Sequence, residues 1–427
     1  MTRPDPHQPP LLSGLSGCGA PCTNAPEDAF LKRRASSMLV LVCVASVLVG
    51  CVKHASASAA TPAVPGITHA QALRLRDSVR AVLIRALSDS AFPGAYAAVG
   101  TADGVITDYG VGRLDVADAS RPSATTIWDL ASLTKVVGTT SAMIQLVGSG
   151  RVALDSPVVR YLPAWRAPGA ARITVRHLLS HTSGMPAWRA LYKEAATPEE
   201  AEQQLFATSP DTVPGVRYVY SDLGFILLGK LVERVSGERL AQYDSAHLFS
   251  PLVMTDTRYL PPTVLLPRIA PTEQDPWRQR KVRGEVHDEN AVRLGGVSGH
   301  AGLFSTGQDL SRFARMYLHY GTLEGVRVFD SATVTVFTRL QDSTISRRAL
   351  GWETPTGGNS AGTRLSSTAF GHTGFTGTSL WMDPEQGVFV LLLTNRVNPT
   401  RENRKIGAVR TSLANAVVGA LRGTSGQ

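Results

Sequence analysis

The chain has 427 residues, of which 43% are hydrophobic and 18% charged. It is therefore long enough to bury a large core, and its composition excludes a wholly disordered protein. The net charge is +9, carried almost entirely by arginine, but no long block of like charges occurs, so a nucleic-acid partner is not supported. All four cysteines lie within residues 1–51.

The N-terminal 51 residues have the order of an export signal. Residues 1–31 are rich in Pro, Gly and Ser, and the basic triplet 32–34 precedes an apolar run over 38–49. This run is too short to span a membrane and is typical of a secretion signal. The tetrapeptide Leu48-Val49-Gly50-Cys51 resembles the bacterial lipobox, which implies lipidation of Cys51. We therefore expect an exported bacterial protein that is anchored by lipid to the cell envelope; a plain signal peptide or an uncleaved anchor is the alternative.

The first regular elements follow a linker. Residues 52–66 are rich in Ala, Ser and Pro and predict a linker between membrane and folded domain. Thr68 and Gln71 have the spacing of a capping box, and the apolar stripe after them predicts a helix to about Ser88. Two strands are expected over 95–100 and 105–112, around an Asp-Gly turn.

A serine and a lysine three residues apart begin the next helix. The apolar stretch before Ser132 and the spacing of the apolar residues after it predict a helix from Ser132 to Gly148. Residues three apart lie on one helix face, so the Lys135 ammonium can reach the Ser132 hydroxyl. A partly desolvated lysine has a lowered pKa and can activate a serine nucleophile. An ordinary helix start with a solvated lysine is the alternative.

The middle of the chain, residues 151–316, is predicted to be mostly helical with long loops. His177 and His181 are four residues apart, as in some metal sites, but no third ligand is evident and a structural role is favoured. We expect no metal and no organic cofactor. Another apolar helix is expected over 225–235.

The C-terminal part returns to strands. Residues 378–382 and 388–394 flank a turn and predict a hairpin, and residues 406–421 predict an amphipathic helix. The fold expected is α/β (α+β), with one antiparallel sheet built from both chain ends, flanked by helices, and a mainly helical lobe inserted between them.

Two further stretches suggest chemistry around Ser132. Tyr220 lies in Tyr-Val-Tyr-Ser-Asp, and its phenol can pass a proton if a cation such as Lys135 lowers its pKa. A buried aromatic pair with Asp222 as a helix cap is the alternative. The glycine-rich stretch 371–377 allows close approach of a ligand and offers N–H groups to an oxyanion, or it is a loop that needs glycine conformations.

These stretches together resemble the motifs of the serine β-lactamase and penicillin-binding protein superfamily, which are Ser-x-x-Lys, Tyr-x-Asn and Lys-Thr-Gly. They occur here in that order as Ser132–Lys135, Tyr220–Asp222 and His372–Gly374. The tyrosine in the second motif resembles that of one branch of the superfamily, the class C β-lactamases and D-alanyl-D-alanine carboxypeptidases. The resemblance covers residues 67–422 and implies a β-lactamase/transpeptidase-like fold for this domain.

The resemblance also implies catalytic roles. Ser132 would be the nucleophile, and Lys135 and Tyr220 would shuttle its proton. The backbone N–H groups of Ser132 and Phe375 would form the oxyanion hole.

The remaining motif residues would bind substrate: Asp222, His372, Thr373 and Gly374. Two of them depart from the family pattern. Asp222 replaces an asparagine and, lacking a donor when ionised, can instead hold Lys135 charged. His372 replaces a permanent cation with a switchable one.

The expected function is that of a serine hydrolase that forms an acyl-enzyme on Ser132. D-alanyl-D-alanine-type cell-wall peptides or related amides are the preferred substrates. An esterase of small acyl esters, a class C-like β-lactamase and a non-hydrolysing penicillin-binding protein are the alternatives.

Overall fold

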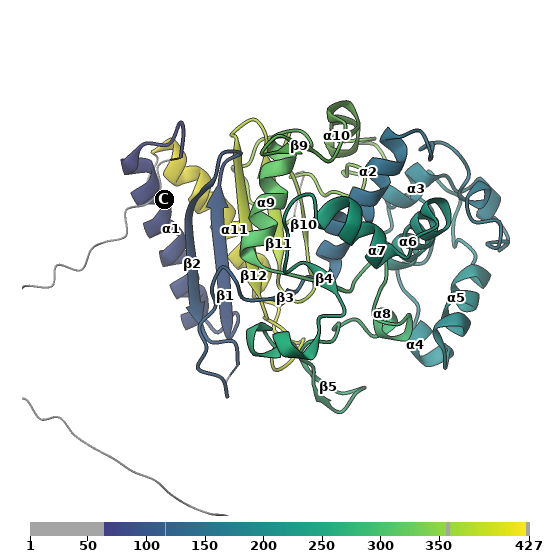
Figure 1. The fold of residues 1–427 in the computed structure, drawn as a ribbon, viewed down its shortest axis with the longest axis horizontal. Coiled ribbons are helices and arrows are strands. Elements are labelled where there is room, and N and C mark those ends of the chain that lie inside the picture. Colours follow the sequence, from purple (N-terminus) through teal and green to yellow (C-terminus); the bar gives the residue numbers. More distant parts are fainter. Residues whose placement is uncertain (1–63, 116, 356–358, 424–427) are drawn as a thin grey trace, which may run out of the picture. The chain divides into compact units, whose positions relative to one another are not determined.

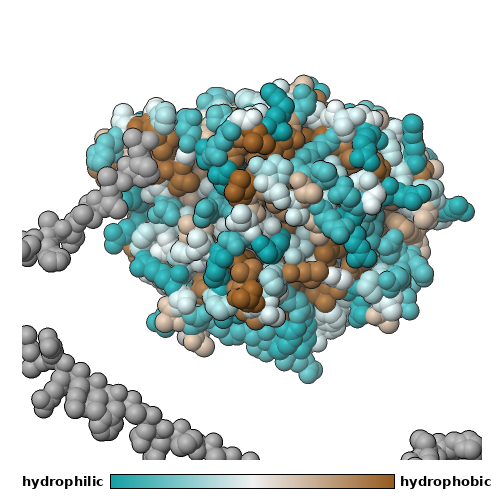
Figure 2. All heavy atoms as spheres, viewed as in Figure 1, coloured by the Kyte–Doolittle hydropathy of each residue, from teal (hydrophilic) through white to brown (hydrophobic). Residues whose placement is uncertain are grey.

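The computed structural model describes residues 64–115, 117–355 and 359–423. The predicted export signal, Cys51 and most of the linker lie outside these residues. Within them, no helix combines the length and hydrophobicity needed to cross a membrane. On the face seen in Figure 2, hydrophilic residues surround small groups of hydrophobic ones.

The central sheet joins the two ends of the chain, as predicted (Figure 1). Its five strands are antiparallel in the order β10-β11-β12-β1-β2. They are β1 (Gly94–Gly100), β2 (Val105–Gly112), β10 (Phe370–Thr373), β11 (Ser379–Asp383) and β12 (Val388–Thr394). Strands β1 and β12 pair along their length, from Ala95 opposite Thr394 to Gly100 opposite Phe389. The predicted C-terminal hairpin is β11–β12.

The terminal helices α1 (His69–Ser88) and α11 (Ile406–Arg422) pack together on one face of the sheet (Figure 1). The predicted capping box starts α1, where the Thr68 hydroxyl accepts the N–H of Gln71. Alternate residues of β1 and β12 point into this layer, since successive strand residues face opposite sides of a sheet.

The opposite face carries α9 (Gly307–Leu318) and the main hydrophobic core, which continues into the helical lobe. The helix α6 (Asp222–Ser236) is buried in this lobe; Ser221, and not Asp222, caps its start, because the Ser221 hydroxyl accepts the N–H of Gly224. The lobe and its connections also contain α3 (Val175–Leu179), α4 (Leu191–Glu194), α5 (Pro198–Ala207), α7 (Leu240–Asp244), α8 (Glu289–Arg293), α10 (Ser331–Thr338), the short 3-10 helices Val158–Arg160, Ala170–Arg172 and Thr263–Arg268, and the π-helix Ser245–Phe249. Short strands pair as β3 (Trp128–Asp129), β7 (Leu303–Ser305) and β4 (Arg258–Tyr259), as β5 (Gln274–Asp275) with β6 (Arg280–Lys281), and as β8 (Thr322–Leu323) with β9 (Val326–Arg327).

The helix that begins near Ser132 is not a uniform α-helix, contrary to the prediction. A 3-10 turn over Ala131–Leu133 is followed by a π-helix over Lys135–Thr140, and only then by α2 (Ser141–Gly148). The Ser141 hydroxyl donates to the carbonyl of Val136, 2.9 Å away, which competes with the regular helical ladder and favours a wider turn.

The buried carboxyl group of Asp244 packs against this π-helix at Gly138. A Cβ on Gly138 would lie 2.6 Å from Oδ2 of Asp244, so only glycine fits there without a shift. The Tyr259 hydroxyl donates to the same oxygen, 3.2 Å away. Burial raises the pKa of Asp244 to about 8.

We predict that Asp244 makes the fold less stable as pH rises. The folded chain keeps the Asp244 proton up to pH of about 8, whereas the unfolded chain loses it near its ordinary pKa of 3.8. The free energy of unfolding therefore falls between these pH values, and Asp244→Asn makes this decline shallower. Urea unfolding from pH 4 to 8 tests this, with the exposed Asp103→Asn as control. Parallel curves for wild type and Asp244→Asn would contradict it.

Candidate active site

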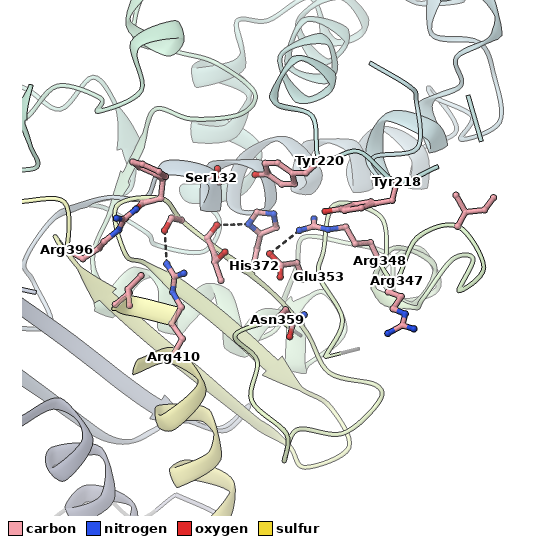
Figure 3. A pocket seen from close by; sticks show the side chains of 15 residues that line it. Ser132, Tyr218, Tyr220, Arg347, Arg348, Glu353, Asn359, His372, Arg396 and Arg410 are labelled. Carbon is pink, nitrogen blue, oxygen red and sulfur yellow. Dashed lines mark hydrogen bonds and ion pairs between the residues drawn. The ribbon is translucent and has the colours of Figure 1, made fainter. Parts of the chain in front are cut away.

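The three predicted motifs meet at a pocket of about 680 Å³ between the sheet and the helical lobe (Figure 3). Ser132, Tyr220 and His372 line it, so segments that are far apart in the chain converge there. The other lining residues are Tyr218, Ile345, Arg347, Arg348, Glu353, Asn359, Thr373, Gly374, Phe375, Arg396, Ile406 and Arg410.

The Lys135 ammonium is fully buried and touches three acceptors. Its Nζ donates to Oγ of Ser132 at 3.0 Å and to the carbonyl of His300 at 3.1 Å, and it forms an ion pair with Oδ1 of Asp222 at 2.7 Å. Burial is the largest single effect and lowers the pKa of Lys135, but the charges and hydrogen bonds of Asp222 and Tyr220 together outweigh burial, so the pKa is raised. The expectation of a lowered lysine pKa is therefore wrong, and the expectation that Asp222 holds Lys135 charged is confirmed.

Tyr220 packs between cations and aromatic rings. Its ring centroid lies 5.1 Å from Nζ of Lys135 and 4.5 Å from the ring of His181. Burial raises the pKa of the phenol; Lys135 lowers it and Asp222 raises it, and the net direction is upward. The expected lowering of the tyrosine pKa is therefore wrong, because burial outweighs the nearby cation. The resting site holds an ammonium and a neutral phenol around Ser132.

His372 is a neutral acceptor and not the switchable cation that was expected. Its Nδ1 donates to the carbonyl of Thr373, 2.8 Å away, so its lone pair lies on Nε2. No described residue bonds to Nε2. Burial and the charges of Arg348 and Lys135 hold the pKa of His372 well below its usual value, so the imidazole stays uncharged at neutral pH.

Arg348 supplies the buried positive charge on this side of the pocket, and the sequence alone did not single it out. Its Nη2 pairs with Oε1 of Glu353 at 3.0 Å, and its side chain is 7% exposed. Its guanidinium lies over the rings of Tyr220 and Tyr218, with Cζ 5.3 and 5.8 Å from their centroids. Among the described residues, Nη1 has no hydrogen-bond partner. One donor of a buried cation is therefore without a partner among the described residues.

The turn between β10 and β11 is pressed against the residues before Ser132. A Cβ on Gly374 would lie 2.1 Å from Oγ1 of Thr378 and 2.4 Å from the carbonyl of Leu130, so glycine is required. Arg410 donates to the carbonyls of Gly374 and Thr378, at 2.7 and 2.8 Å. The next residue, Phe375, is thereby held beside Ser132 in the pocket wall.

Two backbone donors remain available at this point. Within the part of the chain that the structure describes, neither the N–H of Ser132 nor that of Phe375 makes a hydrogen bond. Unpaired N–H groups on adjacent segments are the arrangement that an oxyanion requires.

Asp129 connects the segment of Ser132 with that of Phe375, and sequence reasoning missed this role. Its carboxylate accepts the N–H of Ala131 at 2.8 Å and that of His287 at 2.6 Å. The His287 ring stacks on Phe375, with centroids 5.6 Å apart. Ala131, directly before Ser132, has a φ of 47°, which is rare for a residue with a side chain. Asp129 therefore stabilises the strained turn that presents Ser132 and also helps to place Phe375.

The histidine pair has the structural role that was favoured. His177 takes part in the capping box of α3, and His181 accepts the N–H of Ser221 at 3.0 Å beside Tyr220. No group of three or more His, Cys, Asp or Glu side chains suited to a metal occurs among residues 64–115, 117–355 and 359–423.

We predict that Asp222→Asn shifts the pH dependence of activity. Asparagine carries no charge, so burial then lowers the pKa of Lys135 and the neutral amine forms at lower pH. The rising limb of kcat/KM against pH should move to lower pH. A pH series with a chromogenic ester tests this, with Asp155→Asn, which breaks an exposed ion pair with Arg176, as the matched control. A limb that stays in place or moves upward would contradict the assigned ion pair.

Comparisons with known proteins agree with this geometry. The family model described as Beta-lactamase matches residues 79–414. A Bacillus subtilis (strain 168) protein named N-acetylmuramyl-L-alanine amidase is 34% identical over 306 residues, which are 64% of this chain and 68% of that protein. A Salmonella typhi protein named "Putative D-alanyl-D-alanine carboxypeptidase" is 30% identical over 326 residues, which are 67% of this chain and 73% of that protein.

The fold has matches among solved structures. The crystal structure of a penicillin-binding protein homologue from Caulobacter crescentus is similar with a TM-score of 0.67 at 21% identity. The match covers 84% of this chain and 100% of that chain. At this identity the likeness shows the fold alone, and it confirms the predicted β-lactamase/transpeptidase-like architecture.

Proposed function

Because this chain belongs to the β-lactamase family of serine hydrolases, we propose that it hydrolyses amide bonds of cell-wall peptides through an acyl-enzyme on Ser132. Ser132 is the nucleophile, and Lys135 and Tyr220 move its proton. The N–H groups of Ser132 and Phe375 bind the carbonyl oxygen as it gains charge.

The reaction begins when the scissile carbonyl lies against those two N–H groups. The Ser132 oxygen attacks the carbonyl carbon, and its proton passes to the Lys135–Tyr220 pair, which must first lose a proton because both groups are protonated at rest. The same pair then protonates the departing amine. In the second half of the reaction, water attacks the ester on Ser132 and gives a proton to the Lys135–Tyr220 pair. The pair returns a proton to the Ser132 oxygen as its bond to the acyl carbon breaks, which releases the acid and restores the serine.

The observation that carries the substrate assignment is the unpaired Nη1 of Arg348. A buried cation with an unused donor favours an anion, because the bond restores part of the solvation that burial removed. Beside it in the pocket, Nε2 of His372 can accept an N–H. A peptide with a free carboxylate in its leaving group offers both, as a D-alanyl-D-alanine terminus does. Thr373 and Gly374 line the wall along which such a peptide extends.

The amide between a muramyl group and L-alanine is the second candidate substrate. The Bacillus subtilis relative that carries this activity in its name is 34% identical to this chain. Both candidates contain an amide bond next to an alanine, and they differ in whether the acyl group released to Ser132 is a peptide or a sugar acid.

We predict that Arg348 selects for a free carboxylate. Wild type should hydrolyse a D-Ala-D-Ala peptide with kcat/KM on the order of 30-fold above that of the same peptide with an amidated C-terminus, since loss of one partner of a buried charge pair costs about 2 kcal/mol or more. Arg348→Gln should remove this preference, and Arg348→Lys should keep part of it. The comparison is repeated with a muramyl-L-alanyl peptide and its amidated form.

Ser132→Ala is the control for the nucleophile. It should abolish turnover of every substrate and leave no acyl adduct in the mass spectrum of the intact protein. Equal turnover by wild type and Ser132→Ala would overturn the assignment, and so would failure of wild type to hydrolyse either cell-wall substrate.

We further propose that the protein acts at the cell envelope, held by a lipid on Cys51. The basic triplet, the apolar run and the lipobox-like tetrapeptide support this. The linker 52–66 would let the anchored hydrolase reach a substrate in the cell wall.

We predict that Cys51→Ser abolishes lipid labelling. Cells that express the full chain with radiolabelled palmitate should yield a labelled protein in the membrane fraction for wild type and for Cys43→Ser, the matched control within the apolar run. Label that survives Cys51→Ser would refute the lipid anchor.

A further inference from the structure

Three aromatic side chains form a cluster on the surface near the pocket. Trp188 and Trp277 are 47% and 37% exposed, and Tyr192 lies between them. The ring centroids of Trp188 and Tyr192 are 6.3 Å apart, and those of Tyr192 and Trp277 are 4.9 Å apart. Among the described residues, neither indole N–H makes a hydrogen bond. The cluster therefore combines exposed ring faces with unused polar donors.

The segment that carries Trp188 is hydrogen-bonded to the segment that follows Tyr220. The Ser221 hydroxyl donates to the carbonyl of Pro186 at 2.6 Å, and the N–H of Asp222 donates to the carbonyl of Ala187 at 2.9 Å. Trp188 is the next residue, so its backbone is fixed beside the residues that hold Tyr220 and pair with Lys135.

Trp277 is connected to Phe375, in the pocket wall, through Arg278 and His287. It lies in the turn between β5 and β6, and the guanidinium of Arg278 lies 5.2 Å from its ring centroid. Arg278 also donates to the carbonyls of Val286 and His287, at 2.9 and 3.2 Å. The His287 ring stacks on Phe375, which supplies the second oxyanion N–H. A chain of contacts through Arg278 and His287 thus links the aromatic cluster to Phe375.

These contacts place the cluster on a defined side of the nucleophile. In Figure 3, Arg348 and Arg396 lie on opposite sides of Ser132. The Phe375 ring packs on Arg396, with Cζ of Arg396 4.5 Å from the ring centroid, so Phe375 and His287 belong to the side away from Arg348. If the leaving group is held by Arg348, the acyl part of the substrate extends toward the aromatic cluster.

We propose that Trp188, Tyr192 and Trp277 bind a pyranose ring of the glycan strand that carries the peptide. This inference rests on the proposed function and adds a sugar to its substrate. The C–H faces of a pyranose pack against aromatic faces, which have a partial negative charge. Its hydroxyl and acetamido oxygens can accept hydrogen bonds from the free indole N–H groups. Three rings offer far less area than the roughly 800 Å² per partner of a stable protein interface, which favours a small ring over a protein.

The first test measures binding without hydrolysis. Ser132→Ala is titrated with the peptide-free disaccharide N-acetylglucosaminyl-N-acetylmuramic acid, and saturation-transfer NMR and tryptophan fluorescence report binding. Adding Trp277→Ala or Trp188→Ala should weaken binding by about tenfold, in the range of a truncated hot-spot aromatic. Adding Tyr320→Ala, which removes an aromatic that is 49% exposed outside this cluster, should leave it unchanged.

The second test uses turnover. In wild type, a muramyl-linked peptide should have a KM about tenfold below that of the same peptide without sugar, and Trp277→Ala should remove this difference. No binding of the disaccharide, or equal binding by Trp277→Ala and its parent, would overturn the sugar site. The same dependence on Trp277 for sugar-free peptide would also overturn it and assign the cluster to peptide. Loss of hydrolysis with disaccharide binding intact would instead contradict the proposed function.

Discussion

The buried ammonium of Lys135 is the constraint on which the site depends. A charge without contact with water costs several kcal/mol unless it is paired and hydrogen-bonded. Three chain segments supply what it needs: the Ser132 hydroxyl three residues away, the Asp222 carboxylate at the start of α6, and the carbonyl of His300. The side chain of His300 fixes the position of this residue, because its Nε2 lies 2.9 Å from Oδ1 of Asp288. The burial of one charge therefore joins the segments that carry Ser132, Asp222 and His300.

That requirement also fixes the charge of the surrounding groups. Burial and the nearby cations keep the imidazoles of His181 and His372 neutral, and burial keeps the phenol of Tyr220 protonated. Among the described residues, Arg348 is then one of two arginines in the pocket wall with an unused donor, the other being Nε of Arg410, while Lys135 has its three acceptors. The pocket therefore separates two tasks. In the proposed mechanism, one cation controls the serine proton and another binds the carboxylate of a ligand.

Local features of the site could be predicted from the sequence, and long-range ones could not. The contact between Ser132 and Lys135 follows from helical spacing, although the turns there are 3-10 and π. The order of the motifs placed Tyr220 beside them. The direction of its pKa shift was missed because burial is a property of the whole fold. Arg348 looks like any other arginine in the sequence, and Asp129 acquires its role through a hydrogen bond to a residue 158 positions later.

The charge of Lys135 is the central claim and can be measured directly. The chain has only seven lysines, so ¹⁵N-lysine labelling gives a tractable NMR spectrum of the side-chain nitrogens, and Lys135→Ala identifies the resonance. At pH 7 the Lys135 nitrogen should have the chemical shift of an ammonium, with exchange of its protons slowed by burial. It should change to that of a neutral amine only at a pH above the ordinary lysine pKa of 10.5. A neutral amine shift at pH 7 would contradict the account.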